Sequence, residues 1–329
     1  MKAVAISPAK VILFGEHFVV GGNSAISMSI DLPTTVTVEH FTQNQVQVKS
    51  DDLEVEAVFS QDGKLARSSG ENAETTLRPV FQATAFTLKK LNKPEHGLKI
   101  SVTSKVPIGM GLGSSAATAV GTVIGIATLH GSKISNDDVF EAAYSLERMV
   151  HGHPSGVDQA TVTYGGLISY RKGKVNDKLR VTKPPLMIIG NTGKRRSTGE
   201  FVGRVTRLRE TQPNEYGKIA SEAQMIADKA AEWLATDQPE KLGALMNENQ
   251  RLLESVGVSS PELETLISAA RAAGALGAKL TGGGGGGCMI ALVEDSTQLK
   301  VSQAIERAGG QTVPGRFTPK GAQASLCDA

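Results

Sequence analysis

The residues with the clearest chemical potential are three glycines at every second position, Gly109, Gly111 and Gly113, followed by Ser114 and Ser115. They connect a strand-like segment to an apolar helix pattern rich in small residues. Glycine leaves backbone N–H groups unhindered, and a helix N-terminus carries partial positive charge, so this arrangement can cradle a phosphate. The alternative is an ordinary glycine-rich turn with Ser114 as the helix cap. The spacing is not the dinucleotide-binding G-x-G-x-x-G pattern, and a Walker A loop is absent from the sequence.

A second glycine-rich segment consists of six consecutive glycines at residues 282–287. It lies between a well-capped helix pattern and an apolar, strand-like run that begins at Cys288. A flexible linker is the simplest interpretation, but linkers do not usually occupy such a place. We therefore expect a second backbone surface that lies close to a ligand or to the first glycine segment.

Two acidic residues, Glu147 and Asp158, flank a turn rich in Pro and Gly. Neighbouring carboxylates can divide the work of a reaction, one holding a metal ion through oxygen and the other acting as a base. The alternative is a solvated helix residue followed by a turn former. His151 and His153, which lie between them, have no third ligand at a zinc-binding spacing.

Lys10 stands inside an apolar strand pattern that ends in an acid–histidine pair, Glu16 and His17. A buried lysine needs a charged partner, and we predict Asp158 for that role. The alternative is a lysine at the edge of the surface. A short basic loop rich in hydroxyl groups, residues 191–198, can hold an acidic substrate group or can be an ordinary solvated turn.

Composition narrows the class of protein. The chain has 329 residues, enough for two domains, with 40% hydrophobic and 21% charged residues, as in an ordinary globular protein. Its net charge of +2 gives no general attraction to nucleic acid or to an anionic membrane. The two cysteines, Cys288 and Cys327, provide no disulfide framework, and no apolar run is long enough for a membrane span. These features predict a cytoplasmic protein.

The apolar pattern predicts a mostly β region over residues 2–105 and mixed structure beyond it. Helices are expected over residues 75–91, 114–130, 137–150, 215–235, 240–256, 261–273 and 297–308. Strands are expected, among others, over residues 24–40, 45–49, 98–106, 163–171, 179–182, 186–190, 288–294 and 311–317. The helix at 114–130 lacks a charged face and should be buried. Lys183-Pro184-Pro185 marks the expected boundary of an α+β chain with two domains, residues 1–182 and 183–329.

The chain resembles the GHMP small-molecule kinases over nearly its whole length. The segments PAKVILFGEHFVV, KVPIGMGLGSSAA, ERMVHGHPSGVD and GAKLTGGGGGGC occur in the order and approximate positions of the signature regions of that family. Within the family the resemblance is greatest to the mevalonate kinases, because phosphomevalonate kinases tend to carry a tyrosine at the position of His17. Intact Lys10, Glu147 and Asp158 separate the chain from the homoserine kinases.

The resemblance implies a two-domain α+β fold with ATP and its acceptor in the cleft between the domains. It implies that Asp158 is the catalytic base, that Lys10 lies against Asp158 and the substrate hydroxyl, and that Ser115 and Glu147 hold Mg²⁺. The residues implied at the ATP phosphates are Pro107, Gly109, Gly111, Gly113, Ser114, Ser115, Gly283 and Gly284. Those implied at the acceptor are Glu16, His17 and Thr198.

The implied activity is transfer of the ATP γ-phosphate to the 5-hydroxyl of mevalonate, in the mevalonate pathway of isoprenoid biosynthesis. The same resemblance implies a homodimer, and we expect no nucleic acid or membrane partner. Two alternatives stay open: a kinase that acts on phosphomevalonate or another small alcohol, and a sensor that binds ligands without turnover. Retention of Lys10, Glu147 and Asp158 disfavours the sensor, which needs neither a base nor a metal ligand.

Overall fold

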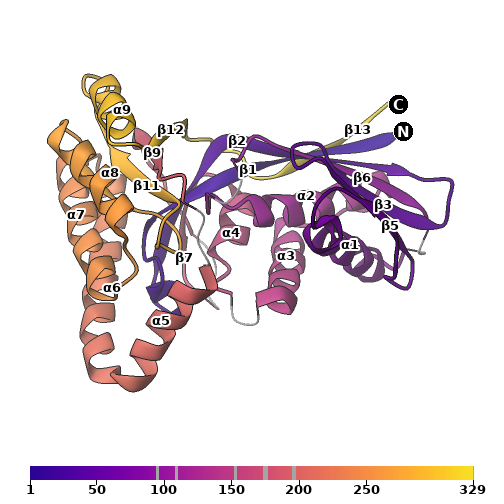
Figure 1. Cartoon of the computed structure of the whole chain (residues 1–329), viewed down its shortest axis with the longest axis horizontal. Helices are drawn as coiled ribbons and strands as arrows, with labels where there is room; N and C mark the ends of the chain where they lie inside the picture. The colour runs from indigo at the N-terminus through magenta and orange to yellow at the C-terminus, as the bar shows by residue number, and fades with distance from the viewer. Residues whose placement is uncertain (94–95, 108–109, 152–153, 173–176, 195–197, 329) are drawn as a thin grey trace.

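The computed structural model describes the chain except residues 94–95, 108–109, 152–153, 173–176, 195–197 and 329. Figure 1 shows two parts joined side by side. In one, a long twisted sheet carries helices under a single face, and in the other, helices pack around a smaller sheet. The two chain ends lie together at the far end of the long sheet.

The large sheet comprises, within the described residues, nine strands in the order β13-β1-β2-β6-β3-β4-β5, with β7 paired to β2 and β8 to β7. β1 pairs antiparallel with β2 from Lys2 opposite Glu39 to Phe14 opposite Ile26. The strands are β1 (Lys2–Phe14), β2 (Ala25–His40), β3 (Gln45–Ser50), β4 (Val55–Ser60), β5 (Leu65–Ser69), β6 (Leu98–Ser104), β7 (Leu167–Tyr170), β8 (Asp177–Lys178) and β13 (Gln323–Cys327).

Four helices lie under this sheet: α1 (Ala73–Lys90), α2 (Ser114–Leu129), α3 (Asn136–His151) and α4 (Val157–Tyr164). α2 is buried along most of its length, as its small-residue sequence predicts. Glycines let it approach the sheet, because a Cβ atom on Gly121 would lie 2.8 Å from Cγ2 of Val36 and one on Gly125 would lie 3.0 Å from Cγ2 of Val38. The close approach fixes the N-terminus of α2 beside the middle of β1.

The second part contains an antiparallel sheet in the order β10-β11-β9-β12 among the described residues. Its strands are β9 (Met187–Asn191), β10 (Gly277–Leu280), β11 (Cys288–Leu292) and β12 (Gln311–Pro314). Its helices are α5 (Thr198–Thr211), α6 (Pro213–Ala235), α7 (Pro239–Ser255), α8 (Pro261–Ala272) and α9 (Gln298–Arg307). α8 begins as predicted, with Pro261 in its first turn and the Ser260 hydroxyl accepting from the N–H of Leu263.

β1 runs from the large sheet into the second part. Val11 and Phe14 of β1 belong to the same apolar core as Leu245 of α7 and Ile290 of β11. The last strand, β13, returns to the large sheet, where Cys327 lies opposite Lys2. The division of the chain at residue 183 stays a prediction.

Three local predictions were wrong. The strand expected over residues 163–171 covers only Leu167–Tyr170, because residues 163 and 164 belong to α4, although Thr and Tyr favour strands. The strand expected over residues 179–182 is instead Asp177–Lys178. α5 was not predicted, because Gly199 and Gly203 lower its helix propensity, and its packing against the rest of the chain overrides that cost.

Three histidines, His40, His96 and His130, lie together at one end of the large sheet. The ring centroid of His96 lies 5.1 Å from that of His40 and 4.9 Å from that of His130. Burial, reinforced by the two neighbouring imidazoles and Lys93, lowers the pKa of His130 to about 4 from 6.5. Between pH 6.5 and about 4, His130 is therefore neutral in the folded chain and protonated in the unfolded chain.

The free energy of unfolding should consequently fall as pH falls from 6.5 to about 4, the interval in which the unfolded chain alone carries the proton on His130. We expect this residue to account for on the order of 1 kcal/mol of that loss, given its partial exposure. Urea unfolding at pH 7 and pH 4.5 measures it. The His130→Asn variant should show a smaller loss between the two pH values than the parent chain, and equal losses would contradict this origin.

Candidate active site

Lys10 lies at the centre of the candidate site. Its buried side chain places Nζ 2.9 Å from Oδ1 of Asp158, and Nζ donates to the carbonyl oxygen of Gly111 at 3.2 Å. The N–H of Lys10 donates to the carbonyl oxygen of Leu112 at 2.9 Å. A Cβ atom on Gly113 would lie 2.8 Å from Cγ of Lys10, so glycine allows the close approach. The ion pair predicted from the sequence is confirmed, and it joins the carboxylate to the first glycine segment.

Asp158 lies in the first turn of α4, after a left-handed glycine, Gly156, at φ 91°. The preceding turn is held by the hydroxyl of Tyr170, which donates to the carbonyl oxygen of Ser155 at 2.6 Å. The Asp158 side chain is 36% exposed, whereas that of Lys10 is 3% exposed. A carboxylate that is open on one side and held by a buried cation on the other is suited to accept a proton from a bound hydroxyl.

In the described part of the first glycine segment, two glycines have a backbone conformation that is compatible with the predicted phosphate cradle. Gly111 and Gly113 have positive φ values of 72° and 85°, and Gly113 precedes the first turn of α2. The N-cap residue, Gly113, has no side chain that could cap the helix, and the first turn of this fully described helix contains no acidic residue. Its N–H groups and partial positive charge are therefore available to an anion. Ser114 is half-buried and Ser115 is exposed at this end of the helix.

Ser115 and Glu147 supply the kinds of oxygen atom that Mg²⁺ prefers. Ser115 is the second residue of α2, and Glu147 is a half-buried residue of the neighbouring helix α3. Mg²⁺ usually takes one or two protein ligands and completes its shell with water and substrate phosphates. A hydroxyl in the first turn of α2 and a carboxylate of α3 fit that chemistry.

The six-glycine segment, residues 282–287, is not a free linker. The N–H of Gly285 donates to the carbonyl oxygen of Val258 at 2.8 Å, and the hydroxyl of Thr192 donates to that of Gly287 at 3.1 Å. A Cβ atom on Gly284 would lie 1.9 Å from the Val258 oxygen. Hydrogen bonds and close contacts with neighbouring residues thus fix the backbone conformation of the segment.

Glu16 is paired with a lysine that sequence reasoning missed. Its Oε1 accepts from Nζ of Lys279, which also donates to the carbonyl oxygen of Leu280 at 2.7 Å. Both side chains of the pair are 0% exposed. Burial raises the pKa of Glu16 and lowers the pKa of Lys279, while each charge opposes the shift of the other. A lysine within the apolar stretch GAKL is the signal, the same one that identified Lys10.

His17 borders a small cavity. Its backbone has a positive φ of 63°, which is uncommon for a residue with a side chain and marks a constrained turn. Residues of the turn, α5 and α6 line the cavity: His17, Val20, Val202, Val205, Thr206, Arg209 and Tyr216. The cavity has a volume of about 10 Å³, which is room for a single water-sized group.

Some of the remaining predicted site residues lie outside the described part of the chain. Gly109 lies outside the described residues, and so do Arg195 and Arg196 of the basic loop. Thr198 begins α5, but its side chain is outside the described part. Pro107 is exposed, and Gly283 is half-buried in the six-glycine segment.

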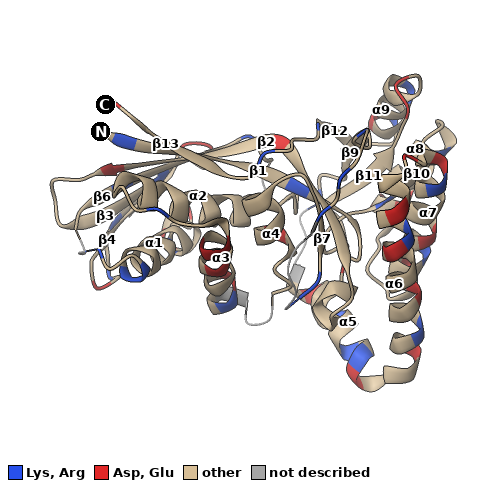
Figure 2. Ribbon diagram, turned by 180° about the vertical axis from the view of Figure 1, so that it is seen from behind, with Lys and Arg blue, Asp and Glu red and all other residues tan. Residues whose placement is uncertain are grey.

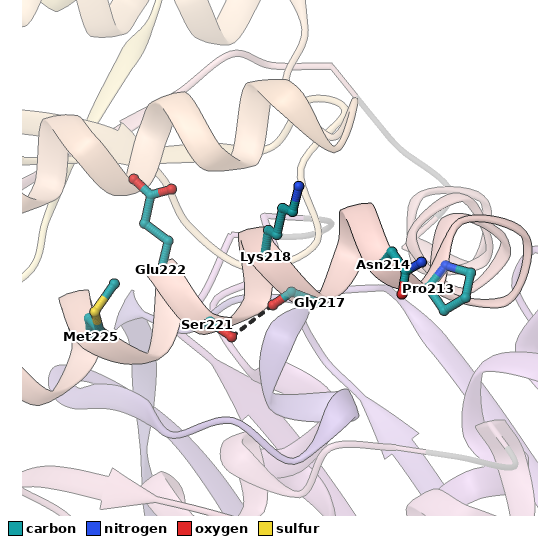
Figure 3. Close-up of a pocket in the computed structure, with 7 residues that line it drawn as sticks. All are labelled: Pro213, Asn214, Gly217, Lys218, Ser221, Glu222 and Met225. Carbon is teal, nitrogen blue, oxygen red and sulfur yellow. Dashed lines mark hydrogen bonds between the residues drawn. The ribbon is translucent and has the colours of Figure 1, made fainter.

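Two larger hollows lie away from the Lys10–Asp158 pair. One, of about 650 Å³, runs along the first half of α6, and Figure 3 shows its lining residues, Pro213, Asn214, Gly217, Lys218, Ser221, Glu222 and Met225. The other, of about 640 Å³, lies between β1 and the segment that leads into β13. Figure 2 shows acidic and basic residues interspersed along α6 and α7, with no continuous basic face in that view.

Comparison with known proteins gives two family matches. Residues 78–166 match the GHMP kinases N terminal domain, and residues 230–311 match the GHMP kinases C terminal domain. A mevalonate kinase of Thermococcus gammatolerans is 39% identical, over 98% of both chains. One from Pyrococcus furiosus is 38% identical, over 94% of both chains.

Solved structures give the same relationship. The crystal structure of the Methanococcus jannaschii mevalonate kinase has a TM-score of 0.82 and 28% sequence identity, and the alignment covers 96% of this chain and 98% of that one. The L. major mevalonate kinase in complex with R-mevalonate has a TM-score of 0.77 and 28% identity, covering 95% of this chain and 96% of that one. The similarity thus extends over both parts of the fold.

Proposed function

This chain belongs to the GHMP kinase family, and we propose that it transfers the γ-phosphate of ATP to the 5-hydroxyl of mevalonate. It has the two-domain α+β fold of that family and is an ATP-dependent kinase. The acceptor is supported by relatives that are mevalonate kinases over nearly the full length, and by a similar structure that contains R-mevalonate. The product, 5-phosphomevalonate, belongs to isoprenoid biosynthesis.

The observation that carries the proposal is the Lys10–Asp158 pair beside the first glycine segment. Asp158 would accept the proton of the acceptor hydroxyl as its oxygen attacks the γ-phosphorus. Phosphoryl transfer passes through a loose transition state, so alignment and neutralisation of spreading charge matter most. Lys10 and the N–H groups at the start of α2 would supply that neutralisation.

We assign Mg²⁺ to Ser115 and Glu147 on the chemistry of their oxygen atoms. When bound, Mg²⁺ neutralises phosphate charge and orients the phosphates. The side chains of His17 and Thr198 are proposed to contact the acceptor, and Gly283 and Gly284 to approach the phosphates.

Replacement of Glu147 by Gln should raise the Mg²⁺ concentration needed for half-maximal rate by about tenfold or more, because a neutral amide is a weaker ligand. A magnesium titration at fixed ATP measures this. Glu141→Gln is the matched control, since Glu141 is exposed on the same helix. An unchanged magnesium requirement in Glu147→Gln would remove Glu147 from the metal site.

The acceptor is tested by ADP release from Mg²⁺-ATP with mevalonate, with phosphomevalonate and with no acceptor. We expect rapid release with mevalonate alone. Release with phosphomevalonate alone would keep the mechanism and change the acceptor. No ADP release with either compound would favour another small alcohol as the acceptor, or the sensor alternative.

A homodimer and a cytoplasmic location are further proposals, and both come from the family resemblance. Light scattering of the purified chain should give twice the mass of 34.5 kDa, and a mass of one chain would contradict the dimer. Among the described residues, no helix has the length and apolar character to cross a membrane.

A further inference from the structure

The strongest feature that the proposed mechanism leaves unused is the buried ion pair of Glu16 and Lys279. Both side chains are 0% exposed, and the two residues come from opposite ends of the chain. Removing two charges from water is costly, and only good geometry offsets the cost. An apolar pair would fill this space at a smaller free-energy cost, so the two charges are expected to position other groups.

Glu16 lies between two constrained backbone positions. Gly15 has a φ of 91°, and a Cβ atom there would lie 2.3 Å from the carbonyl oxygen of Ser24. His17, at φ 63°, follows directly. The side chain of Glu16 points into the protein and so anchors the turn that presents His17 to its cavity.

Lys279 lies at the other end of this connection, in the strand that leads to the six-glycine segment. Two residues along, the hydroxyl of Thr281 accepts from the N–H of Ile12 and donates to its carbonyl oxygen, both at 2.9 Å. Residues two apart in an extended strand point to the same side. The hydrogen bonds of Thr281 and the ion pair of Lys279 therefore connect β1 and the turn that follows it to the start of the six-glycine segment.

A second lysine also acts on Glu16. Lys10, which forms the ion pair with Asp158, lowers the pKa of Glu16 through its charge, although less than Lys279 does. Loss of Lys279 alone would leave the buried carboxylate of Glu16 without its ion-pair partner, whereas loss of the charges of both Glu16 and Lys279 would leave neither one unpaired.

We propose that Glu16 and Lys279 are positioning residues whose buried ion pair holds His17 and the six-glycine segment in register, with no contact to ATP or acceptor. This rests on the proposed function, because His17 is taken to face the acceptor and the glycines to face the phosphates. It differs from the role of acceptor ligand that the family resemblance implies for Glu16.

A double-mutant cycle separates the two roles. Lys279→Met should lower kcat/KM for mevalonate by about a hundredfold, as expected when reacting groups are displaced by about 1 Å, and should lower Tm by about 5 °C or more. Adding Glu16→Gln should restore most of both quantities, because the unpaired charge is gone. Lys229→Met, at an exposed position of α6, is the control and should change neither.

If Glu16 binds the acceptor directly, the double variant will regain Tm but stay as impaired in KM for mevalonate as Glu16→Gln alone, and that result overturns the proposal. Should Lys279→Met fail to fold, Glu16→Asp provides the test, because it keeps the charge and retracts the carboxylate. We then expect a loss in kcat as well as a raised KM for both mevalonate and ATP. A raised KM for mevalonate alone would overturn the proposal.

The cycle stays informative if the acceptor assignment fails. The parent chain is assayed first, and the acceptor that it uses in the ADP-release assay replaces mevalonate in the cycle. Calorimetric titration with a non-hydrolysable ATP analogue adds a readout without any acceptor. Weaker analogue binding in Lys279→Met, restored in the double variant, is expected, and unchanged binding in Lys279→Met would contradict the link to the glycine segment.

Discussion

Asp158→Asn lowers the turnover number by about a thousandfold or more in our expectation, because the reaction loses its general base while the phosphate cradle remains. The amide has nearly the same size as the carboxylate and still lies beside Lys10, so the fold should persist. Steady-state turnover with mevalonate measures the loss, and calorimetric titration with a non-hydrolysable ATP analogue should give a similar Kd to that of the parent chain.

Asp295→Asn is the matched control for this substitution, since Asp295 is exposed and lies in the turn between β11 and α9. Its turnover should equal that of the parent chain. A turnover in Asp158→Asn within a few-fold of the parent would exclude Asp158 as the base. A large loss of analogue binding would instead move the residue to the nucleotide site.

Gly284→Ala has the second largest expected effect, a rise of about a hundredfold in KM for ATP or a comparable loss of kcat/KM. Its Cβ atom would lie 1.9 Å from the carbonyl oxygen of Val258, and its φ of 70° is unfavourable for a residue with a side chain. The segment must therefore move away from Val258, and this displacement should disturb the proposed contact with the ATP phosphates. Initial rates over a range of ATP concentrations, together with Tm, measure both consequences.

Gly203→Ala is the control for the added methyl group. Gly203 lies in α5 with no atom within 4 Å of a Cβ position, so alanine should leave KM unchanged and strengthen the helix slightly. If Gly284→Ala shows a lower Tm but an unchanged KM for ATP, the segment supports the fold and does not approach the phosphates.

The parts of the site that the sequence predicts are those that follow from a local physical demand. A lysine in an apolar strand demands a buried anion, and Lys10 has it in Asp158. A helix of small residues demands close burial, which α2 obtains through Gly121 and Gly125. Six glycines between two regular elements demand a backbone conformation that other residues resist, and most of them have positive φ.

The missed parts depend on tertiary structure. Lys279 and Glu16 are far apart in the sequence, and only the crossing of β1 and β10 brings them together. α5 has weak helix propensity and is held by contacts such as the Arg204 hydrogen bond to the carbonyl oxygen of Gly257 at 2.8 Å. β13 is a short edge strand with polar residues, and it is a strand because its backbone pairs with the edge of β1. Propensity and periodicity carry none of this information.

The proposed transfer to the 5-hydroxyl is tested most directly by ³¹P NMR of the product formed from mevalonate and Mg²⁺-ATP. Phosphate on the primary 5-hydroxyl couples to the two protons of its carbon, so we predict a new triplet that appears with the ADP resonances and is absent with Asp158→Asn. An uncoupled singlet would place the phosphate on the tertiary hydroxyl or the carboxylate, and inorganic phosphate alone would mean hydrolysis of ATP. Either result would contradict the proposed reaction.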